Sequence, residues 1–329
     1  MAQPAARAGV SRRGDPSPAA AVRSVGAVAS PVLAVVGSTA TGKSDLALDV
    51  VELLGGPAAA EVVNADAMQL YRGMDIGTAK LPVAERRGVV HHQLDVLDVT
   101  EEANVAAYQR EARADLAAVA GRGRHGVLVG GSGLYVRAVL DELEFPGTDP
   151  EVRGRLEVRA KEEGPGILFR ELAERDPVAA ERIPPGNTRR IVRALEVIEL
   201  TGRPYSATLP EHRYHLPAVQ VAIDVPREEL LTRISARARA MLDGGLLEET
   251  RELLDAGLAR GRTASRAVGY AQAVAVLEGR LSVDDAHEAI SVATRQLARR
   301  QQQWFRRDPR VHWLPPSPDL PERVAALLA

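Results

Sequence analysis

The first apolar stretch of the chain predicts a buried strand followed by a glycine-rich loop. Val32–Val36 is a continuous apolar run that ends at Gly37, which is typical of a strand in a parallel sheet covered on both faces. Further strand candidates are 61–65, 93–97, 126–129, 219–225 and 311–314. Amphipathic patterns such as 45–54 and 105–120 lie between them and predict helices. This alternation predicts an α/β fold, with a doubly wound and mainly parallel sheet.

One stretch of the chain lacks the alternation of strands and helices. From 149 to 209 the pattern is helical, with turn signals such as Pro184-Pro185-Gly186-Asn187 and no strand-like run. We therefore expect an all-helical insertion domain at 149–209 within an α/β core formed by 31–148 and 210–329. Residues 1–30 are Ala, Pro, Arg, Gly and Ser without an apolar period, which predicts a disordered tail rather than a secretory signal.

The loop after the first strand carries a phosphate-binding motif. The segment Gly37-Ser38-Thr39-Ala40-Thr41-Gly42-Lys43-Ser44 matches G-x-x-x-x-G-K-[ST], follows an apolar strand and opens a helix. Glycines let the backbone wrap a phosphate, the amides and the helix N-terminus face its charge, and Lys43 adds a point charge. Ser44 would ligate Mg²⁺. The motif predicts a diphosphate or triphosphate site.

The acids near this loop decide what kind of chemistry it serves. The strand at 126–129 ends in Gly130-Gly131-Ser132-Gly133 without an acid, which disfavours an ATP- or GTP-driven motor or switch. Asp66 follows the strand at 61–65, and carboxyl ends of neighbouring strands line one crevice in such a sheet. Asp66 is therefore a candidate general base for an acceptor nucleophile. An alternative is a small-molecule P-loop kinase that uses ATP, and another is a catalytically silent RNA-binding module.

The composition of the chain excludes several further classes of protein and of functional site. The net charge of −2 argues against indiscriminate coating of nucleic acid, and no apolar run is long enough to span a membrane. Without cysteine there is no disulfide framework, thiol nucleophile or thiolate metal site. His91 and His92 lack a third metal ligand at suitable spacing and are expected at a strand edge near the crevice. The only lysines are Lys43, Lys80 and Lys161.

Several spaced motifs together resemble one enzyme family. They are Gly37–Ser44, Asn64–Lys80, Gly130–Tyr135, Asn187–Glu196, Ser265–Tyr270 and Thr294–Phe305. In this order they closely resemble the bacterial tRNA dimethylallyltransferases, the IPP transferase family, over about 31–314. The resemblance implies a P-loop α/β core with a helical insertion that grips the tRNA anticodon stem-loop.

The same resemblance implies a prenyl transfer. The family moves a dimethylallyl group from dimethylallyl diphosphate to N6 of adenosine at position 37 of tRNAs that read codons beginning with U. The expected enzyme is thus a cytoplasmic, Mg²⁺-dependent tRNA dimethylallyltransferase, and we expect a monomer. The partners implied are tRNA and dimethylallyl diphosphate, with no membrane.

The resemblance to the family implies catalytic roles for individual residues of this chain. The resemblance makes Asp66 the base, and Lys43 with the loop amides stabilises the leaving diphosphate. The family's usual Asp-Ser is Asp66-Ala67 here, so the serine hydroxyl is lost while the acid remains. Ser132 stands where threonine is frequent and implies a transition-state contact. Arg233 is expected to reach the diphosphate, although its spacing alone equally suits a surface ion pair with Glu229.

The resemblance also implies a set of tRNA contacts. They are Asp66, Ala67, Met68, Gln69, Arg153, Arg189, Arg190, Arg193, Arg266, Gly269 and Tyr270. From the residues alone, the arginines on the helix at 188–200 could equally form a solvated face. Trp304 and Phe305 are expected to fasten the C-terminal helix to the core, and stacking on RNA is the alternative.

Overall fold

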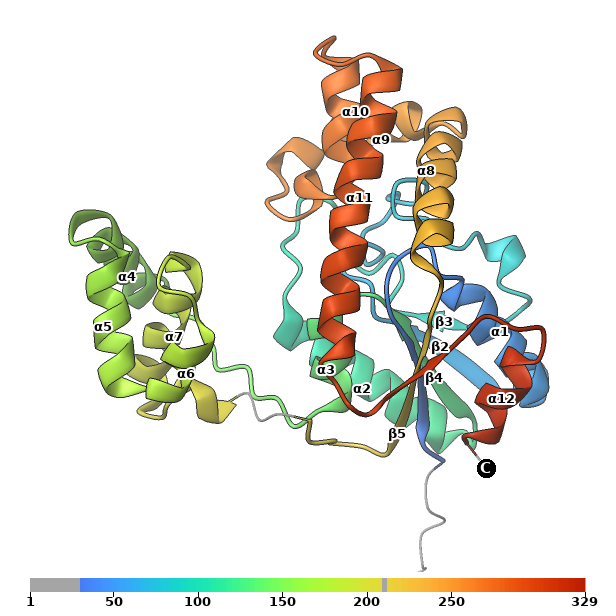
Figure 1. Ribbon diagram of the computed structural model, residues 1–329, viewed down its shortest axis with the longest axis horizontal. Helices are drawn as coiled ribbons and strands as arrows, with labels where there is room; N and C mark the ends of the chain where they lie inside the picture. Colours follow the sequence, from blue (N-terminus) through green and yellow to red (C-terminus); the bar gives the residue numbers. More distant parts are fainter. Residues whose placement is uncertain (1–29, 209–211, 329) are drawn as a thin grey trace, which may run out of the picture.

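Six strands form a single parallel sheet with the order β3-β2-β4-β1-β5-β6 (Figure 1). The structure is a computed structural model and describes residues 30–208 and 212–328. The strands are β1 (Val32–Val36), β2 (Ala60–Asn64), β3 (His91–His92), β4 (His125–Gly130), β5 (Ala218–Ile223) and β6 (Val311–Leu314). The α/β, mainly parallel fold class is confirmed, and the tail predicted at 1–30 lies outside the described residues except for Ser30.

Helices connect the strands and cover both faces of the sheet. They are α1 (Lys43–Leu53), α2 (Val105–Gly121), α3 (Gly133–Leu140), α4 (Pro150–Glu162), α5 (Pro165–Arg175), α6 (Pro177–Arg182), α7 (Thr188–Thr201), α8 (Arg227–Asp243), α9 (Leu246–Asp255), α10 (Tyr270–Leu277), α11 (Val283–Arg306) and α12 (Leu320–Ala326). Within the described ranges, none of these helices combines the length and apolar character needed to cross a bilayer.

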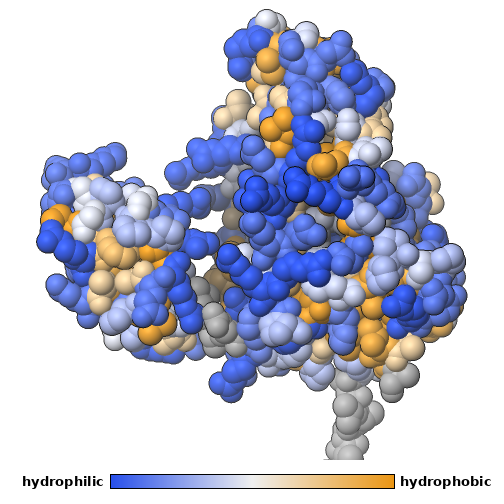
Figure 2. Space-filling model, viewed as in Figure 1, coloured by the Kyte–Doolittle hydropathy of each residue, from blue (hydrophilic) through white to orange (hydrophobic). Residues whose placement is uncertain are grey.

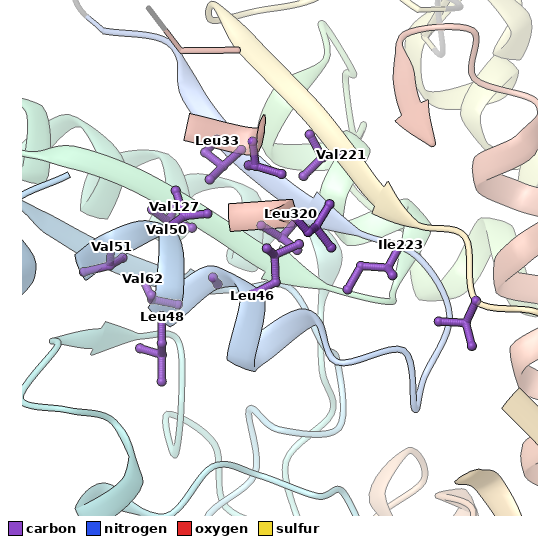
Figure 3. Close-up of a cluster of buried hydrophobic side chains, with 14 of the residues drawn as sticks. Leu33, Leu46, Leu48, Val50, Val51, Val62, Val127, Val221, Ile223 and Leu320 are labelled. Atoms are coloured by element: carbon purple, nitrogen blue, oxygen red, sulfur yellow. The ribbon is translucent and has the colours of Figure 1, made fainter. Parts of the chain in front are cut away.

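Each face of the sheet carries its own hydrophobic core because successive strand residues point to opposite sides. Leu33 and Val35 belong to a buried cluster with residues of α1 and α12 (Figure 3). Ala34 and Val36 belong to a second cluster, with residues of α2 and α3. The continuous apolar run of β1 is therefore buried on both sides, as its sequence predicts, and it holds the loop at its carboxyl end in the middle of the sheet.

One predicted strand is wrong. The run 93–97 is not extended: β3 is only His91–His92, at the edge of the sheet beside β2. Gln93 and Asp95 have φ angles of 58° and 57°, left-handed conformations that a strand does not contain. Lys80 holds this loop, because its ammonium group donates to Asp95 Oδ1 at 2.5 Å and to the carbonyl of Tyr71 at 2.8 Å. A buried charge partner thus overrides the apolar pattern.

Helices α4–α7 form a separate group beside the sheet and have a hydrophobic core of their own (Figure 1). The chain leaves the main body after α3 and returns before β5, and the two connections meet at an isolated bridge between Asp141 and Tyr214. Asp141 is completely buried and accepts hydrogen bonds from Arg137 and Arg310. This ion cluster fastens the base of the helical group to the core.

The long helix α11 runs from the upper helices down to the sheet. Ile290 lies in a cluster shared with α8, α9 and α10, while Phe305 is buried in the cluster under α2 and α3. Trp304 packs beside Phe305 and closely against Gly133. The expectation that these two aromatic side chains fasten the C-terminal helix to the core is confirmed.

Candidate active site and cleft

The phosphate-loop motif joins β1 to α1 in a conformation that only some residues accept. Gly37 and Gly42 have φ angles of 123° and 90°, a region that favours glycine. Ala40 has a φ of 63°, so the loop also holds a non-glycine residue in the left-handed region. The ammonium group of Lys43 folds back over the loop and donates to the carbonyl of Ser38 at 2.5 Å. The first amides of a helix have no acceptor within the helix, so the N-terminus of α1 suits an anion.

Asp66 lies just beyond the carboxyl end of β2, and the buried side chain of Asn64 holds its backbone. The Asn64 amide group accepts from the Asp66 N–H and donates to the carbonyl of Asp66, both at 3.0 Å. It also donates to the carbonyl of Gln93 at 2.9 Å. Asp66 Oδ1 accepts the N–H of Met68 at 3.0 Å. Asn64 had no predicted role of its own, and only its place at a strand end could have pointed to one.

Lys43 and Asp66 have shifted acidities because they line the same cavity. Burial lowers the pKa of Lys43 to about 8, and the negative charge of Asp66 opposes that shift. Burial raises the pKa of Asp66, while the Met68 N–H and the charge of Lys43 hold it down. At neutral pH Lys43 is therefore closer to losing its proton than an ordinary lysine, and Asp66 is a stronger base than an ordinary aspartate.

Two joined cavities meet at Asp66. The polar one has a volume of about 280 Å³ and is lined by the phosphate loop, the Gly130-Gly131 turn and His91. The second has about 300 Å³ and a more apolar lining that includes Met241 and Leu297. Both are lined by Thr39, Asp66, Thr78, Ala79, Arg237 and Gln301. Asp66 thus stands between a site for charge and a site for apolar groups.

The glycines at the end of β4 let two other parts of the chain approach closely, namely the residue after β2 and helix α11. A Cβ atom at Gly130 would lie 2.2 Å from the carbonyl oxygen of Ala65, and one at Gly131 would lie 2.4 Å from Gln301 Nε2. A Cβ atom at Gly133 would lie 2.2 Å from the ring of Trp304. The predicted site residue Ser132 lies in the same segment and contacts the loop after β2. Its hydroxyl accepts the N–H of Ala67 at 3.1 Å. Ser132 therefore braces the loop that carries Asp66.

The arginine that lines the cavities is Arg237, whereas the sequence analysis expected Arg233 at the diphosphate. In the described part of the chain, neither cavity is lined by Arg233, whose guanidinium pairs with Glu229 at 2.5 Å and is exposed. Arg237, one helical turn later on α8, lines both cavities. Burial lowers the pKa of Arg237, and the charge of Asp45 opposes the shift. Spacing alone did not separate the two arginines, since they share one face of the helix.

A larger cleft of about 1150 Å³ separates the helical group from the main body (Figure 2). Hydrophilic side chains project into it from both sides. Its lining contains arginines from both walls, namely Arg153, Arg189, Arg193, Arg262 and Arg266. Met68 lines both this cleft and the apolar cavity, so the cleft leads toward Asp66. Arg262 was not predicted. Arg190 is exposed but does not border the cleft as formed by residues 30–208 and 212–328.

Two of the cleft arginines also have structural partners. Glu196 is completely buried, and both Arg153 and Arg193 pair with its carboxylate, at 2.7 and 2.9 Å. Arg193 further donates to the carbonyls of Pro146 and Gly147, at 2.6 and 3.0 Å. The Arg193 guanidinium thus ties α7 to the connection that enters the helical group, in addition to lining the cleft.

Two residues predicted to contact tRNA, Gly269 and Tyr270, lie beneath the surface. Both residues are buried, and Tyr270 is completely inaccessible. The Tyr270 hydroxyl donates to Glu249 at 2.5 Å, and the same carboxylate accepts the backbone N–H groups of Asp75, Ile76 and Gly77. Tyr270 therefore supports the 75–77 turn from behind and presents no surface to a partner.

Two further predicted residues, Gln69 and His91, lie at the polar cavity. Gln69 lines the polar cavity and donates to the carbonyl of Thr78 at 3.1 Å. His91 and His92 form the edge strand, and His91 lines the polar cavity, as expected. Among residues 30–208 and 212–328, no group of three or more His, Asp or Glu side chains is placed to hold a metal ion.

A family model described as IPP transferase matches residues 69–308. The chain belongs to the IPP transferase family. Curated relatives support this membership: the tRNA dimethylallyltransferase of Kineococcus radiotolerans is 58% identical over 307 residues, covering 91% of this chain and 96% of the relative. The protein of the same name from Thermobifida fusca is 58% identical over 301 residues, covering 91% and 94%.

Solved structures of family members have the same fold. The full-length tRNA isopentenylpyrophosphate transferase of Bacillus halodurans is 34% identical, with a TM-score of 0.64 over 91% of this chain and 94% of that one. A eukaryotic dimethylallyltransferase acting on tRNA is 25% identical, with a TM-score of 0.74 over 87% of this chain and 73% of that one. Because these matches span both the sheet and the helical group, the family fold extends over nearly all described residues.

Proposed function

We propose that this protein transfers a dimethylallyl group from dimethylallyl diphosphate to N6 of adenosine at position 37 of tRNA and releases diphosphate. The tRNAs are those that read codons beginning with U. The observation that carries the proposal is the position of Asp66 between the phosphate-loop cavity and the apolar cavity. The names of the close relatives support the same reaction.

The polar cavity suits the diphosphate. The leaving group gains negative charge as its carbon–oxygen bond breaks, so fixed positive groups and N–H donors stabilise the transition state. Lys43, Arg237 and the amides at the start of α1 are the groups available there. The apolar cavity next to it suits the hydrocarbon part of the donor or the target base.

Magnesium fits the same place through Ser44. Mg²⁺ is usually held by few protein ligands together with substrate phosphates, so a dedicated cluster of acids is not required. The exposed Ser44 lies at the cavity beside Asp45, and both offer oxygen ligands. The ion would neutralise charge on the diphosphate when bound.

Asp66 would act on the acceptor. The lone pair of adenine N6 forms the new carbon–nitrogen bond, and the carbon–oxygen electron pair leaves with diphosphate. The proton displaced from N6 passes to the Asp66 carboxylate, whose raised pKa makes it a better acceptor than an ordinary aspartate. Asn64 and Ser132 hold the loop in which Asp66 lies.

The arginine-lined cleft would hold the anticodon stem-loop. Arginines on both walls suit RNA phosphates, and the target base must leave its stack to enter a pocket. In this proposal 149–209 is the tRNA-binding insertion domain, and 31–148 with 210–329 is the catalytic core. We also propose action as a monomer in the cytoplasm, where tRNA is modified.

The proposal is tested by incubating the purified protein with unmodified tRNA and either dimethylallyl diphosphate or ATP. Digested tRNA should contain prenylated adenosine only with dimethylallyl diphosphate, and the product should be absent with Asp66→Ala. ATP-dependent phosphorylation of a small molecule without prenylated adenosine would instead support a P-loop kinase.

A further inference from the structure

Gln301 lies on the buried side of α11, between the apolar residues Ala298 and Phe305. Ala298 and Phe305 are both buried on this face. Gln301 lies three positions after Ala298 and four before Phe305, so all three share one side of the helix. At this point α11 passes over the two cavities, and Gln301 lines both of them.

The Gln301 amide group connects the two loops that frame the polar cavity. Its Oε1 accepts the backbone N–H of Thr39, in the phosphate loop, at 2.9 Å. Its Nε2 donates to the carbonyl of Gly131, in the turn after β4, at 3.0 Å. One contact needs an acceptor and the other a donor, and a side-chain amide supplies both at once. The missing side chain at Gly131 makes the room, since a Cβ atom there would lie 2.4 Å from Nε2.

We propose that Gln301 is a positioning residue that fixes the phosphate loop against the Gly130-Gly131 turn and so sets the affinity of the site for diphosphate. The identity of the ligand rests on the proposed function. Gln301 ties down the N–H of Thr39, immediately before Ala40 with its unfavourable φ of 63°. The loop amides that follow are thereby held in one arrangement before the ligand arrives.

The hydrogen bonds of Gln301 also set the distance between the phosphate loop and the wall of the apolar cavity. Leu297 and Arg300, on the preceding turn of α11, line the apolar cavity. Because α11 is one continuous helix, anchoring it at Gln301 fixes these side chains relative to the phosphate loop. Gln301 thus positions the phosphate loop directly and the apolar wall through the helix.

The test compares three full-length variants with the wild type. Gln301→Met keeps the size but removes both hydrogen bonds, and Gln301→Glu keeps the acceptor while losing the donor and adding a negative charge. Gln303→Met is the matched control, because Gln303 is exposed on the same helix. Affinities for inorganic pyrophosphate and for dimethylallyl diphosphate are measured by calorimetry without tRNA, and KM for tRNA is measured separately.

We expect Gln301→Met to weaken binding of both diphosphates about tenfold, and Gln301→Glu to weaken it further through charge repulsion. Gln303→Met and every KM for tRNA should stay within about twofold of the wild type. Melting temperatures show whether each variant folds, and Gln301→Glu alone decides the test if Gln301→Met does not fold. A role only in stability predicts an altered melting temperature with unchanged diphosphate affinity.

The result separates this inference from the proposed function. Less than a threefold loss of diphosphate affinity in the folded Gln301 variants, with a wild type that binds diphosphate, overturns the role of Gln301 alone. A loss that is no larger for Gln301→Glu than for Gln301→Met overturns it as well. A wild type that binds neither pyrophosphate nor dimethylallyl diphosphate and prenylates no tRNA overturns the proposed function.

Discussion

Lys43 and Asp66 come from the ends of two different strands, yet they line one cavity and each favours the charged form of the other. Burial works against both charges and has the larger effect on each pKa, so that of Lys43 is lowered and that of Asp66 is raised. The cavity therefore places a cation beside a base. A diphosphate would need the first, and a nucleophile that must lose a proton would need the second.

This relationship predicts a bell-shaped pH dependence of kcat/KM for dimethylallyl diphosphate. Asp66 accepts a proton only when ionised, so activity should fall as the pH drops through its raised pKa. Lys43 attracts diphosphate only when protonated, so activity should fall as the pH rises above about 8. In Lys43→Arg the alkaline decline should disappear, because arginine does not titrate in this range. An unchanged alkaline decline in that variant would refute the assignment to Lys43.

Replacing Asp66 by Asn should remove the base while keeping nearly the same shape. We expect kcat to fall by about 10²–10⁴, the usual contribution of a general base. KM for dimethylallyl diphosphate should change much less, because the phosphate loop is untouched. Steady-state kinetics with Asp243→Asn as the control checks this, since Asp243 is exposed at the end of α8. Full activity of Asp66→Asn would show that another group takes the proton.

The two arginines of α8 should behave differently. Arg237→Ala should raise KM for dimethylallyl diphosphate about 10–100-fold, which corresponds to losing about 1.5–3 kcal/mol from a charge-assisted contact. Arg233→Ala should stay within about twofold, because an exposed ion pair between neighbouring turns contributes only about 0.3–0.5 kcal/mol. Measuring KM for dimethylallyl diphosphate in both variants shows which arginine contacts the diphosphate. The opposite order would restore the prediction made from the sequence.

Much of the site could be predicted because its residues follow strands directly. The phosphate loop after β1 and Asp66 after β2 occupy places that a parallel sheet brings together, whatever the side chains around them. Arg237 and Gln301, which lie on α8 and α11, could not be assigned in this way. Their roles depend on which side of a helix meets a loop far away in sequence, and hydrophobic spacing does not determine that. Asn64 ends β2, and the apolar pattern of that strand does not show that its amide group holds Asp66 and Gln93.

Tyr270 is a residue for which a motif in the sequence suggested a role that its burial does not support. A motif match suggested an RNA contact, but the side chain is buried against Glu249. The strand predicted at 93–97 failed for a related reason, since the Lys80–Asp95 contact bends that segment. In both cases a buried partner distant in sequence decides the local structure.

Tyr270→Phe should therefore change stability rather than tRNA binding. The variant loses a hydrogen bond to a carboxylate, which costs about 1.5–3 kcal/mol of unfolding free energy and lowers the melting temperature by several degrees. KM for tRNA should remain at the wild-type value. Thermal unfolding together with tRNA kinetics checks both parts, and a raised KM without loss of stability would contradict the buried role.

Arg189 and Arg190 are neighbours in sequence that differ in position relative to the cleft. Arg189→Ala should weaken tRNA binding and lower the slope of log affinity against log salt by about one, as expected for one lost phosphate contact. Arg190→Ala should leave both quantities nearly unchanged, because Arg190 does not border the described cleft. Binding titrations at several salt concentrations make the comparison. Equal effects of the two substitutions would contradict the proposed path of the RNA.

The most direct test of the whole account is mass spectrometry of tRNA nucleosides from cells with and without this gene. We predict that deletion replaces N6-dimethylallyladenosine, and any modification built on it, by unmodified adenosine at position 37. A wild-type copy should restore the prenyl group, and an Asp66→Ala copy should not. Prenylated adenosine that persists unchanged after deletion would contradict the proposed function.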